Sequence, residues 1–170
     1  DRRDFGRALV LSTPEQRHHA EAVANLIDGR CAGIFDRAVM HVPAATVIDA
    51  QLVAQSLNVD CTVSIGGGST TGLGKALAIK SNLPNVAIPT TYAGSEMTNV
   101  WGLTEDGRKS TGRDNRVVPT FAIYDPELTL DLPAFISGPS GINAIAQAVV
   151  NVTAASPNPI ITALALDGIR

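Results

Sequence analysis

The chain has 170 residues, of which 45% are hydrophobic and 17% are charged, and its formal net charge is -3 with an isoelectric point of ≈ 5.5. This composition suits one globular domain, or one domain and a piece of another. The acidic balance, without a basic stripe among aromatic residues, argues against a nucleic-acid partner. No apolar stretch reaches the roughly 20 residues of a membrane span, and the start lacks a signal-peptide layout, so we expect a cytoplasmic protein without a membrane partner.

The first 65 residues predict strands alternating with helices. The apolar segment 7–12 is a short strand, after which Thr13 is the predicted N-cap of a helix that ends near Ile27. Pro14 at its first position and Gln16 as the capping-box partner support this helix start. Further elements are predicted as strands at 31–35, 38–42 and 61–65 and as an amphipathic helix at 44–57.

Three consecutive glycines follow the strand at 61–65, in the sequence VSIGGGSTTGLGK. Glycines between a strand and a helix let main-chain N–H groups approach a phosphate, because the missing Cβ allows close contact and the helix N-terminus carries partial positive charge. The spacing fits neither G-x-G-x-x-G nor a Walker A loop. A tight turn without a ligand therefore stays open as the alternative.

The second half of the chain continues the alternation and then changes character. A helix at 70–80 and a buried strand at 85–89 precede a hydroxyl-rich loop, TTYAGSEMT. The segment 99–114 predicts a β-hairpin around Asp106-Gly107, and 117–125 returns to sheet. From Leu132 the pattern is helical and divides at Pro157 and Pro159 into two apolar helices. Such an order favours a mostly parallel sheet with helices on both faces.

Neither the cysteines nor the histidines indicate a metal site. Cys31 and Cys61 are isolated and are interpreted as buried free thiols. His18 and His19 are adjacent on the first helix and so are expected on different faces, while His41 ends a strand in another region. We expect solvent-facing or structural roles for all three. No G-x-S-x-G elbow supports a Ser-His-Asp set.

Four motifs together resemble one known family: SIGGGSTTGLGKALA, VAIPTTYAGSEMT, EDGRKSTGRDNRVVPTFAIYDPELTLDLP and SGINAIAQAV. They occur in the order and spacing of the N-terminal half of the iron-containing (group III) alcohol dehydrogenases, and are most similar to its maleylacetate reductase branch. The resemblance implies an α/β fold: a Rossmann-like, mostly parallel sheet with flanking helices, a β-hairpin, and a trailing helical pair. It implies a dinucleotide-binding domain at 1–134, and the start of a truncated, all-helical C-terminal domain at 135–170.

The resemblance also implies which residues bind a nicotinamide cofactor, NADH or NADPH. Those expected around its pyrophosphate are Gly66, Gly67, Gly68, Ser69 and Thr70. Those expected toward the adenosine or ribose are Thr90 and Thr91, and those expected toward the nicotinamide are Thr98 and Lys109, with Ser95 in the intervening loop. Dinucleotide sites often carry an acid after an early strand, where it binds the ribose 2′-hydroxyl, and the resemblance places the corresponding position near Thr13. Because threonine is neutral, the choice between the two cofactors stays open.

The family's metal ligands are not matched here. An aspartate and a histidine four residues apart correspond to Asn143 and Gln147, whose amides bind divalent cations more weakly. The sequence therefore predicts no metal site, and no catalytic residue is assigned.

The implied activity is NAD(P)H-dependent reduction of a small molecule, maleylacetate, to 3-oxoadipate in the breakdown of aromatic compounds. One alternative is a truncated, non-catalytic module that binds nucleotide or associates with a partner. Another is a metal-dependent alcohol or polyol dehydrogenase. The helices within 140–170 are apolar around much of their circumference. If the chain ends at Arg170, we therefore expect a homodimer or larger homo-oligomer.

Overall fold

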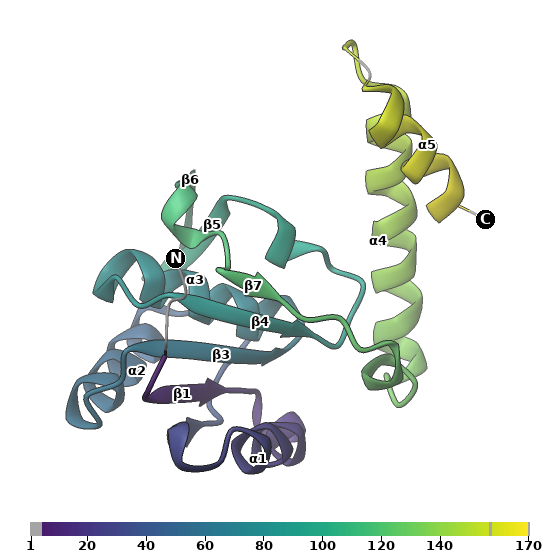
Figure 1. Ribbon diagram of the computed structural model, residues 1–170. Helices are drawn as coiled ribbons and strands as arrows, with labels where there is room; N and C mark the ends of the chain where they lie inside the picture. The colour runs from purple at the N-terminus through teal and green to yellow at the C-terminus, as the bar shows by residue number, and fades with distance from the viewer. Residues whose placement is uncertain (1–4, 157, 170) are drawn as a thin grey trace.

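The computed structural model describes residues 5–156 and 158–169 (Figure 1). One sheet contains the strands β1 (Ala8–Leu11), β2 (Cys31–Phe35), β3 (Cys61–Gly66), β4 (Asn85–Pro89) and β7 (Phe121–Ala122), and a separate hairpin contains β5 (Val100–Glu105) and β6 (Arg108–Arg113). The helices are α1 (Arg17–Leu26), α2 (Ala44–Ser56), α3 (Gly68–Ser81), α4 (Ala134–Val152) and α5 (Pro159–Gly168). In the described part of the chain, no helix combines the length and the hydropathy needed to cross a membrane.

The five-stranded sheet is entirely parallel, with the order β2-β1-β3-β4-β7. From β1 the chain runs outward to β2 and then crosses back to form β3 on the other side of β1. The strand order therefore reverses between β1 and β3, and a crevice forms at the carboxyl ends of such strands. This topology confirms the predicted Rossmann-like α/β class.

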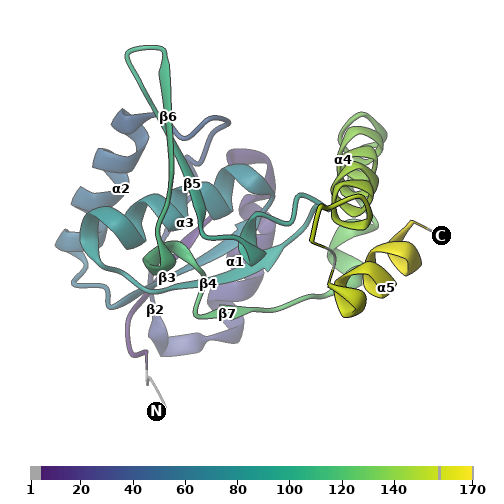
Figure 2. The ribbon, with the colours of Figure 1, turned by 90° about the horizontal axis from the view of Figure 1, so that it is seen from above.

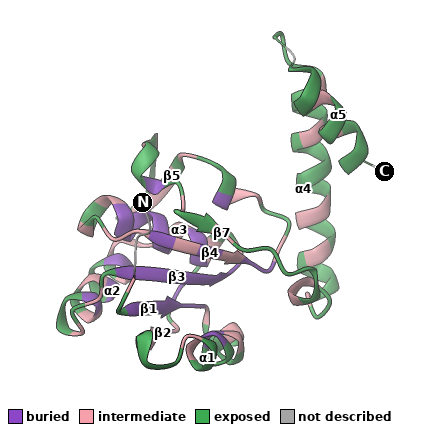
Figure 3. Cartoon of the chain, viewed as in Figure 1, coloured by how far each residue is buried: buried purple, intermediate pink, exposed green. Residues whose placement is uncertain are grey.

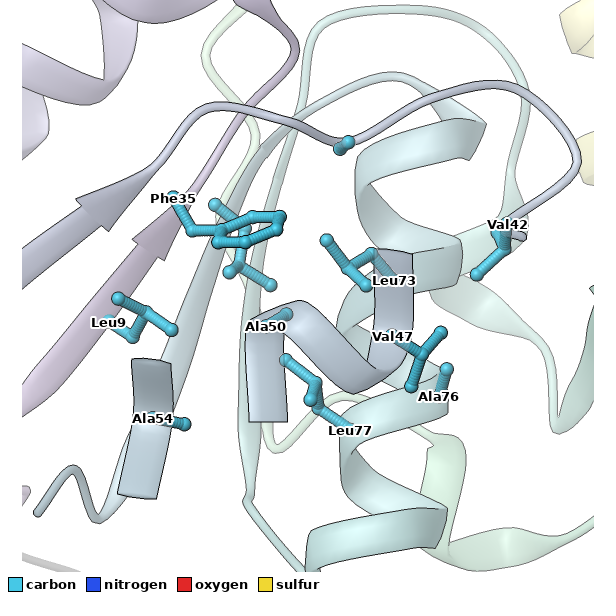
Figure 4. Close-up of a cluster of buried hydrophobic side chains, with 11 residues drawn as sticks. Leu9, Phe35, Val42, Val47, Ala50, Ala54, Leu73, Ala76 and Leu77 are labelled. Atoms are coloured by element: carbon cyan, nitrogen blue, oxygen red, sulfur yellow. The ribbon is translucent and has the colours of Figure 1, made fainter. Parts of the chain in front are cut away.

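Alternate residues of β1 supply the cores on the two faces of the sheet. Leu9 and Leu11 lie on the face covered by α2 and α3, where they pack with Phe35 and with apolar residues of both helices (Figure 4). Ala8 and Val10 lie on the opposite face, in a cluster that includes residues of α1. Each fully buried leucine contributes about 1.5–3 kcal/mol through burial alone. The result is a sheet between two helical layers.

Every residue of β3 is buried, as its sequence predicts for a central strand. Its polar side chains are satisfied internally, since the hydroxyls of Thr62 and Ser64 donate to Asn85 Oδ1 at 3.0 and 2.8 Å. Helix α3 approaches this polar group at Gly74, where an added Cβ would lie 2.7 Å from Asn85 Nδ2. Glycine is therefore required for the helix to pack this close to the strand.

The predicted hairpin is present, with its turn at Asp106-Gly107. Both turn residues have positive φ, 48° and 73°, which is the conformation of a type I′ turn and suits an Asp-Gly pair. Strand β5 contacts both α2 and α3, so the hairpin stands beside these helices (Figure 2). Thr104 N–H donates to Val42 O at 3.1 Å and ties the hairpin to the loop before α2.

The two predicted C-terminal helices, α4 and α5, contact each other and lie beyond the carboxyl ends of β3 and β4 (Figures 1 and 2). Neither helix has a buried residue, and Figure 3 colours both helices as exposed or intermediate. Pro157 lies outside the described residues, whereas Pro159 is the first residue of α5. Its N-cap is Asn158, whose Oδ1 accepts from two N–H groups of the first turn at 2.9 and 3.3 Å.

Several local predictions are wrong because tertiary contacts override local patterns. Segment 38–42 is not a strand, since His41 and Val42 have φ of 68° and 47°, outside the extended region. Segment 117–125 contributes only Phe121–Ala122 to the sheet, because residues 115–117 form a 3₁₀ turn instead.

The capping box before the first helix is also wrong. Residues 14–16 form a 3₁₀ turn, α1 begins only at Arg17, and the side chain of Thr13 makes no capping bond. Of the two thiols, Cys61 is buried, and burial raises its pKa to about 12, whereas Cys31 is only half-buried because β2 is an edge strand.

Candidate functional site

A cleft with a volume of ≈ 1330 Å³ opens at the carboxyl ends of the parallel strands. Its walls are the loops that follow β1, β2, β3 and β4, the hairpin, and residues from the stretch 128–143 on the opposite side. In Figure 1 the arrows of β3 and β4 point toward α4, which stands across from the strand ends. The cleft therefore occupies the crevice in which open α/β sheets bind ligands.

The glycine loop between β3 and α3 has a shape that only glycine permits at two positions. Gly66 has φ 149°, and an added Cβ would lie 2.6 Å from Thr70 Oγ1 and 2.8 Å from Gln16 Oε1. An added Cβ on Gly67 would lie 2.9 Å from Thr91 Cγ2. At Gly68 the nearest atom would be 3.8 Å away, so its missing Cβ leaves space on the side of the cleft rather than avoiding a clash.

Helix α3 presents its N-terminus to this cleft. Its N-cap residue, Gly67, has no side chain to accept a hydrogen bond, and the first intrahelical bond runs from Thr71 N–H to Gly67 O at 3.1 Å. The N–H groups of Gly68, Ser69 and Thr70 therefore precede the hydrogen-bonded part of the helix. Together with the helix dipole, such donors form a site for an anionic group.

Two buried hydroxyls at the same edge of the sheet lack partners within the described residues. They are Ser12 Oγ, just beyond β1, and Thr70 Oγ1, in the first turn of α3. Buried hydroxyls are normally hydrogen-bonded, and an unpaired one costs about 1–3 kcal/mol. Both residues are fully buried and neither lines the cleft, so these hydroxyls lie behind the cleft wall rather than in it.

Gln16 packs against the glycine loop at Gly66 and is held there by Thr90. Its Nε2 donates to Thr90 Oγ1 at 2.8 Å, and Thr90 N–H donates to Gly66 O at 3.1 Å. These bonds join the loop after β1 to the end of β4 beneath the glycines. Thr90 is fully buried by them, whereas its neighbour Thr91 lines the cleft.

A lysine that the sequence did not single out lies in the cleft wall. Lys75, in the middle of α3, is 1% exposed, and its ammonium donates to Thr98 O, Thr98 Oγ1 and Val100 O at 2.8, 3.0 and 2.8 Å. Burial lowers its pKa to about 8, while the negative charge of Glu96 acts in the opposite direction. The sequence contained one signal for this burial. Residues 73–79 are apolar apart from Lys75, so the buried face of this helical stretch includes the lysine.

Glu96 is buried as well and has a partner from a distant part of the chain. Tyr124 OH donates to Glu96 Oε1 at 2.8 Å, and burial followed by this bond raises the pKa of Tyr124 to about 12. The bond links the loop after β4 to the segment after β7. The hydroxyl-rich loop predicted at 90–98 is thus held by two contacts, one from Tyr124 to its Glu96 and one from Lys75 to its Thr98.

The structure brings seven of the ten predicted cofactor residues to the surface of one cleft. They are Gly67, Gly68, Ser69, Thr91, Ser95, Thr98 and Lys109. Of the other three, Gly66 is part of the glycine loop, and Thr70 and Thr90 are buried against it. Trp101 also lines the cleft and is the single tryptophan of the chain.

Comparison with known proteins identifies the family. The family profile described as iron-containing alcohol dehydrogenase matches residues 2–126. The chain belongs to the iron-containing alcohol dehydrogenase family. Its fold is also that of solved relatives: a maleylacetate reductase from Agrobacterium tumefaciens, 48% identical, superimposes with a TM-score of 0.90 over 95% of this chain and 46% of the relative.

Curated members of the family show the same relation in sequence. A maleylacetate reductase from Sphingobium indicum is 56% identical over 164 residues, which is 96% of this chain and 47% of the relative. One from Burkholderia cepacia is 57% identical over the same number of residues. The chain therefore spans about half the length of the relatives it matches.

The two positions that the resemblance assigns to metal ligands, Asn143 and Gln147, do not both face the cleft. Asn143 lines the cleft, whereas Gln147 is exposed on α4 and is not among the lining residues. Within 5–156 and 158–169, no three histidine, cysteine or acidic side chains are grouped so that they could hold a metal ion. The donor set of the described residues therefore does not fit the iron of this family.

The histidines are placed differently from the prediction. His18 and His19 both line the cleft, with ring centroids 4.0 Å apart, and His41 lines it too. The prediction that His41 lies in another region is wrong, because Ala38 N–H donates to Ser12 O at 3.0 Å and carries the loop before α2 across the end of β1. His18 and His41 are exposed, as expected for solvent-facing side chains. Burial and the nearby His18 lower the pKa of His19, while Asp131 opposes the shift.

Proposed function

We propose that this chain is the nicotinamide dinucleotide-binding part of an oxidoreductase of the maleylacetate reductase type. The observation that carries the proposal is the open N-terminus of α3, framed by Gly66 and Gly67, at the strand-order reversal of a chain 56% identical to a maleylacetate reductase. The first N–H groups of α3 and the space beside Gly68 fit a phosphate-bearing ligand. Both NADH and NADPH carry such a group.

In this proposal, the first N–H groups of α3 bind the cofactor pyrophosphate. Gly68, Ser69 and Thr70 supply N–H donors that are fixed before the ligand arrives, so little ordering is needed on binding. Gly66 and Thr70 set the path of the loop. Thr13 lies in the cleft lining and is neutral, so we propose that it does not repel a 2′-phosphate and that both cofactors are accepted.

The remaining predicted residues lie where they can orient the rest of the cofactor. Thr91 lies beside the glycine loop, and Ser95, Thr98 and Lys109 lie in the wall formed by the hairpin and the loop before it. The cofactor, when bound, supplies a hydride. The proposed reaction adds this hydride and one proton across the carbon–carbon double bond of maleylacetate, giving 3-oxoadipate and NAD(P)⁺. The protein's part is positioning and exclusion of water.

We derive no step through a metal ion, because Asn143, Gln147 and the described acidic residues and histidines do not form a metal site. We further propose that residues 1–134 form the cofactor domain and that 135–170 begin a helical domain. The large aliphatic side chains of the latter are exposed, for example Ile142 at 67% and Leu164 at 65%. Apolar surface of this kind favours association, and we propose that this 170-residue chain by itself forms a homodimer or larger homo-oligomer through α4 and α5.

A fluorescence titration tests the cofactor site. Trp101 lines the cleft, so bound NADH should accept energy from it and give a saturable signal. Ser69→Asp places a negative charge at the α3 N-terminus and should weaken NADH binding by about tenfold or more, through repulsion of the pyrophosphate. Ser56→Asp, on an exposed turn at the end of α2, is the matched control and should bind NADH normally.

Three outcomes of this titration and of a turnover assay distinguish an oxidoreductase from a non-catalytic nucleotide-binding module. No saturable signal up to millimolar NADH would contradict the cofactor site. Binding together with turnover of maleylacetate would establish the oxidoreductase. Binding without turnover by this chain would support a nucleotide-binding module that needs further residues for catalysis.

A further inference from the structure

Burying the charge of Lys75 in the interior of this domain is energetically unfavourable. Its ammonium is buried in the wall of the cleft, where burying a charge costs several kcal/mol before any compensation. An apolar side chain of similar length would fill the same space without that cost. Packing alone therefore does not explain a lysine here, and its hydrogen bonds are the feature that an apolar residue could not provide.

All three ammonium protons are used on one short segment. An ammonium has three donors and no acceptor, and the three acceptors here are the carbonyls of Thr98 and Val100 and the hydroxyl of Thr98. Both residues belong to the segment 95–100, which connects β4 to the hairpin. The side chain of Lys75 thus anchors this segment to α3. The same helix carries the N–H groups that we propose bind the phosphates.

The bonds also fix the chemical character of Thr98 toward the cleft. Its hydroxyl accepts from Lys75 and donates its own proton to Ser95 O at 3.1 Å. A hydroxyl has one proton and two lone pairs, so the remaining valence of Thr98 Oγ1 is an acceptor. Thr98 is therefore set to receive an N–H or O–H donor, groups that the carboxamide and ribose of a nicotinamide cofactor carry.

We propose that Lys75 is a positioning residue, which holds the segment 95–100 and presents Thr98 as a hydrogen-bond acceptor to the nicotinamide half of the cofactor. This inference rests on the proposed function, because it assigns a purpose to the same cleft. Lys75 acts through Thr98 and does not itself take part in hydride transfer. One helix would then align both ends of the cofactor, its phosphates through α3 N–H groups and its nicotinamide side through Lys75.

The test combines NADH affinity with local amide exchange. Lys75→Met keeps the length of the side chain and removes its donors, and we expect NADH binding to weaken by about tenfold, as for loss of a charge-assisted contact. Lys75→Gln keeps two N–H donors and should fall between wild type and Lys75→Met, so a partial rescue remains measurable if the methionine variant folds poorly. Lys80→Met, an exposed lysine in the last turn of α3, is the control and should bind normally.

Coupling separates positioning from general support. If Lys75 acts through Thr98, the double variant of Lys75→Met and Thr98→Val should bind NADH no worse than the weaker single variant. The proposal would be overturned if the two substitutions weakened NADH binding independently, so that their fold-losses of affinity multiplied in the double variant. It would also be overturned if Lys75→Met bound NADH within about twofold of wild type.

Hydrogen exchange gives a readout that does not need the cofactor. Amides of residues 95–100 should exchange faster in Lys75→Met and unchanged in Lys80→Met, and unchanged exchange in both would overturn the anchoring role. If wild type fails to bind NADH, the proposed function fails and Thr98 loses its assigned ligand. Faster exchange in the same experiment would still uphold the anchoring of the segment by Lys75.

Discussion

Replacing Gly66 with alanine tests whether the glycine loop is a steric requirement of this fold. The residue has φ 149°, a region that L side chains rarely adopt, and its added Cβ would meet Thr70 Oγ1 at 2.6 Å and Gln16 Oε1 at 2.8 Å. Gln16 is itself held by Thr90, so it cannot move aside without losing that hydrogen bond. Alanine at 66 must therefore shift the loop or break the support beneath it.

Two contributions set the expected loss of stability. A residue held in a glycine-only backbone region costs about 1–3 kcal/mol. Overpacking against buried neighbours costs about 1–3 kcal/mol more. Gly66→Ala should then lower the free energy of unfolding by about 2–6 kcal/mol, a large share of the 5–15 kcal/mol typical of a domain.

Urea unfolding followed by circular dichroism measures this loss, with Gly68→Ala as the matched control in the same loop. An added Cβ at 68 has its nearest neighbour at 3.8 Å, and alanine is favoured over glycine in a helix, so the control should not be destabilised. The midpoint for Gly66→Ala should fall while the slope stays constant. A loss below about 1 kcal/mol, or a loss equal to that of the control, would refute the steric argument.

Three further predictions concern other parts of the chain. Because the pKa of Lys75 is about 8 when folded against 10.5 when unfolded, the unfolded state binds more protons between these values. Wild type should gain up to about 3 kcal/mol over Lys75→Met from pH 8 to 10.5 in denaturation series, and a flat difference would contradict the buried charge. Asn158→Ala should destabilise α5 by about 1 kcal/mol through loss of its N-cap, seen as reduced ellipticity or earlier melting. Light scattering should show an oligomer that Val149→Asp and Leu164→Asp dissociate, whereas a stable 17.7 kDa wild-type monomer would exclude association through these helices.

The parts of this protein that depend on local pattern could be predicted from its amino-acid sequence. The parallel α/β class follows from the buried runs at 61–65 and 85–89 alternating with helices, and both strands are present. The hairpin follows from Asp106-Gly107, because few other residue pairs tolerate positive φ at both turn positions. The resemblance to a family pointed to ten cofactor residues, and the fold collects them around one loop and one cleft wall.

Features that depend on contacts between distant segments could not be predicted in this way and are seen only in the folded chain. A capping box at Thr13–Gln16 is locally favourable, yet Gln16 forms its hydrogen bond with Thr90, 74 residues away. Lys75 has the pattern of an ordinary helical lysine, and its acceptors come from a segment 23 to 25 residues further along the chain. Local propensity is worth tenths of a kcal/mol per residue, whereas satisfying a buried amide or ammonium is worth more than 1 kcal/mol. Where the two conflict, the long-range contact prevails, and no pattern within a single segment reveals it.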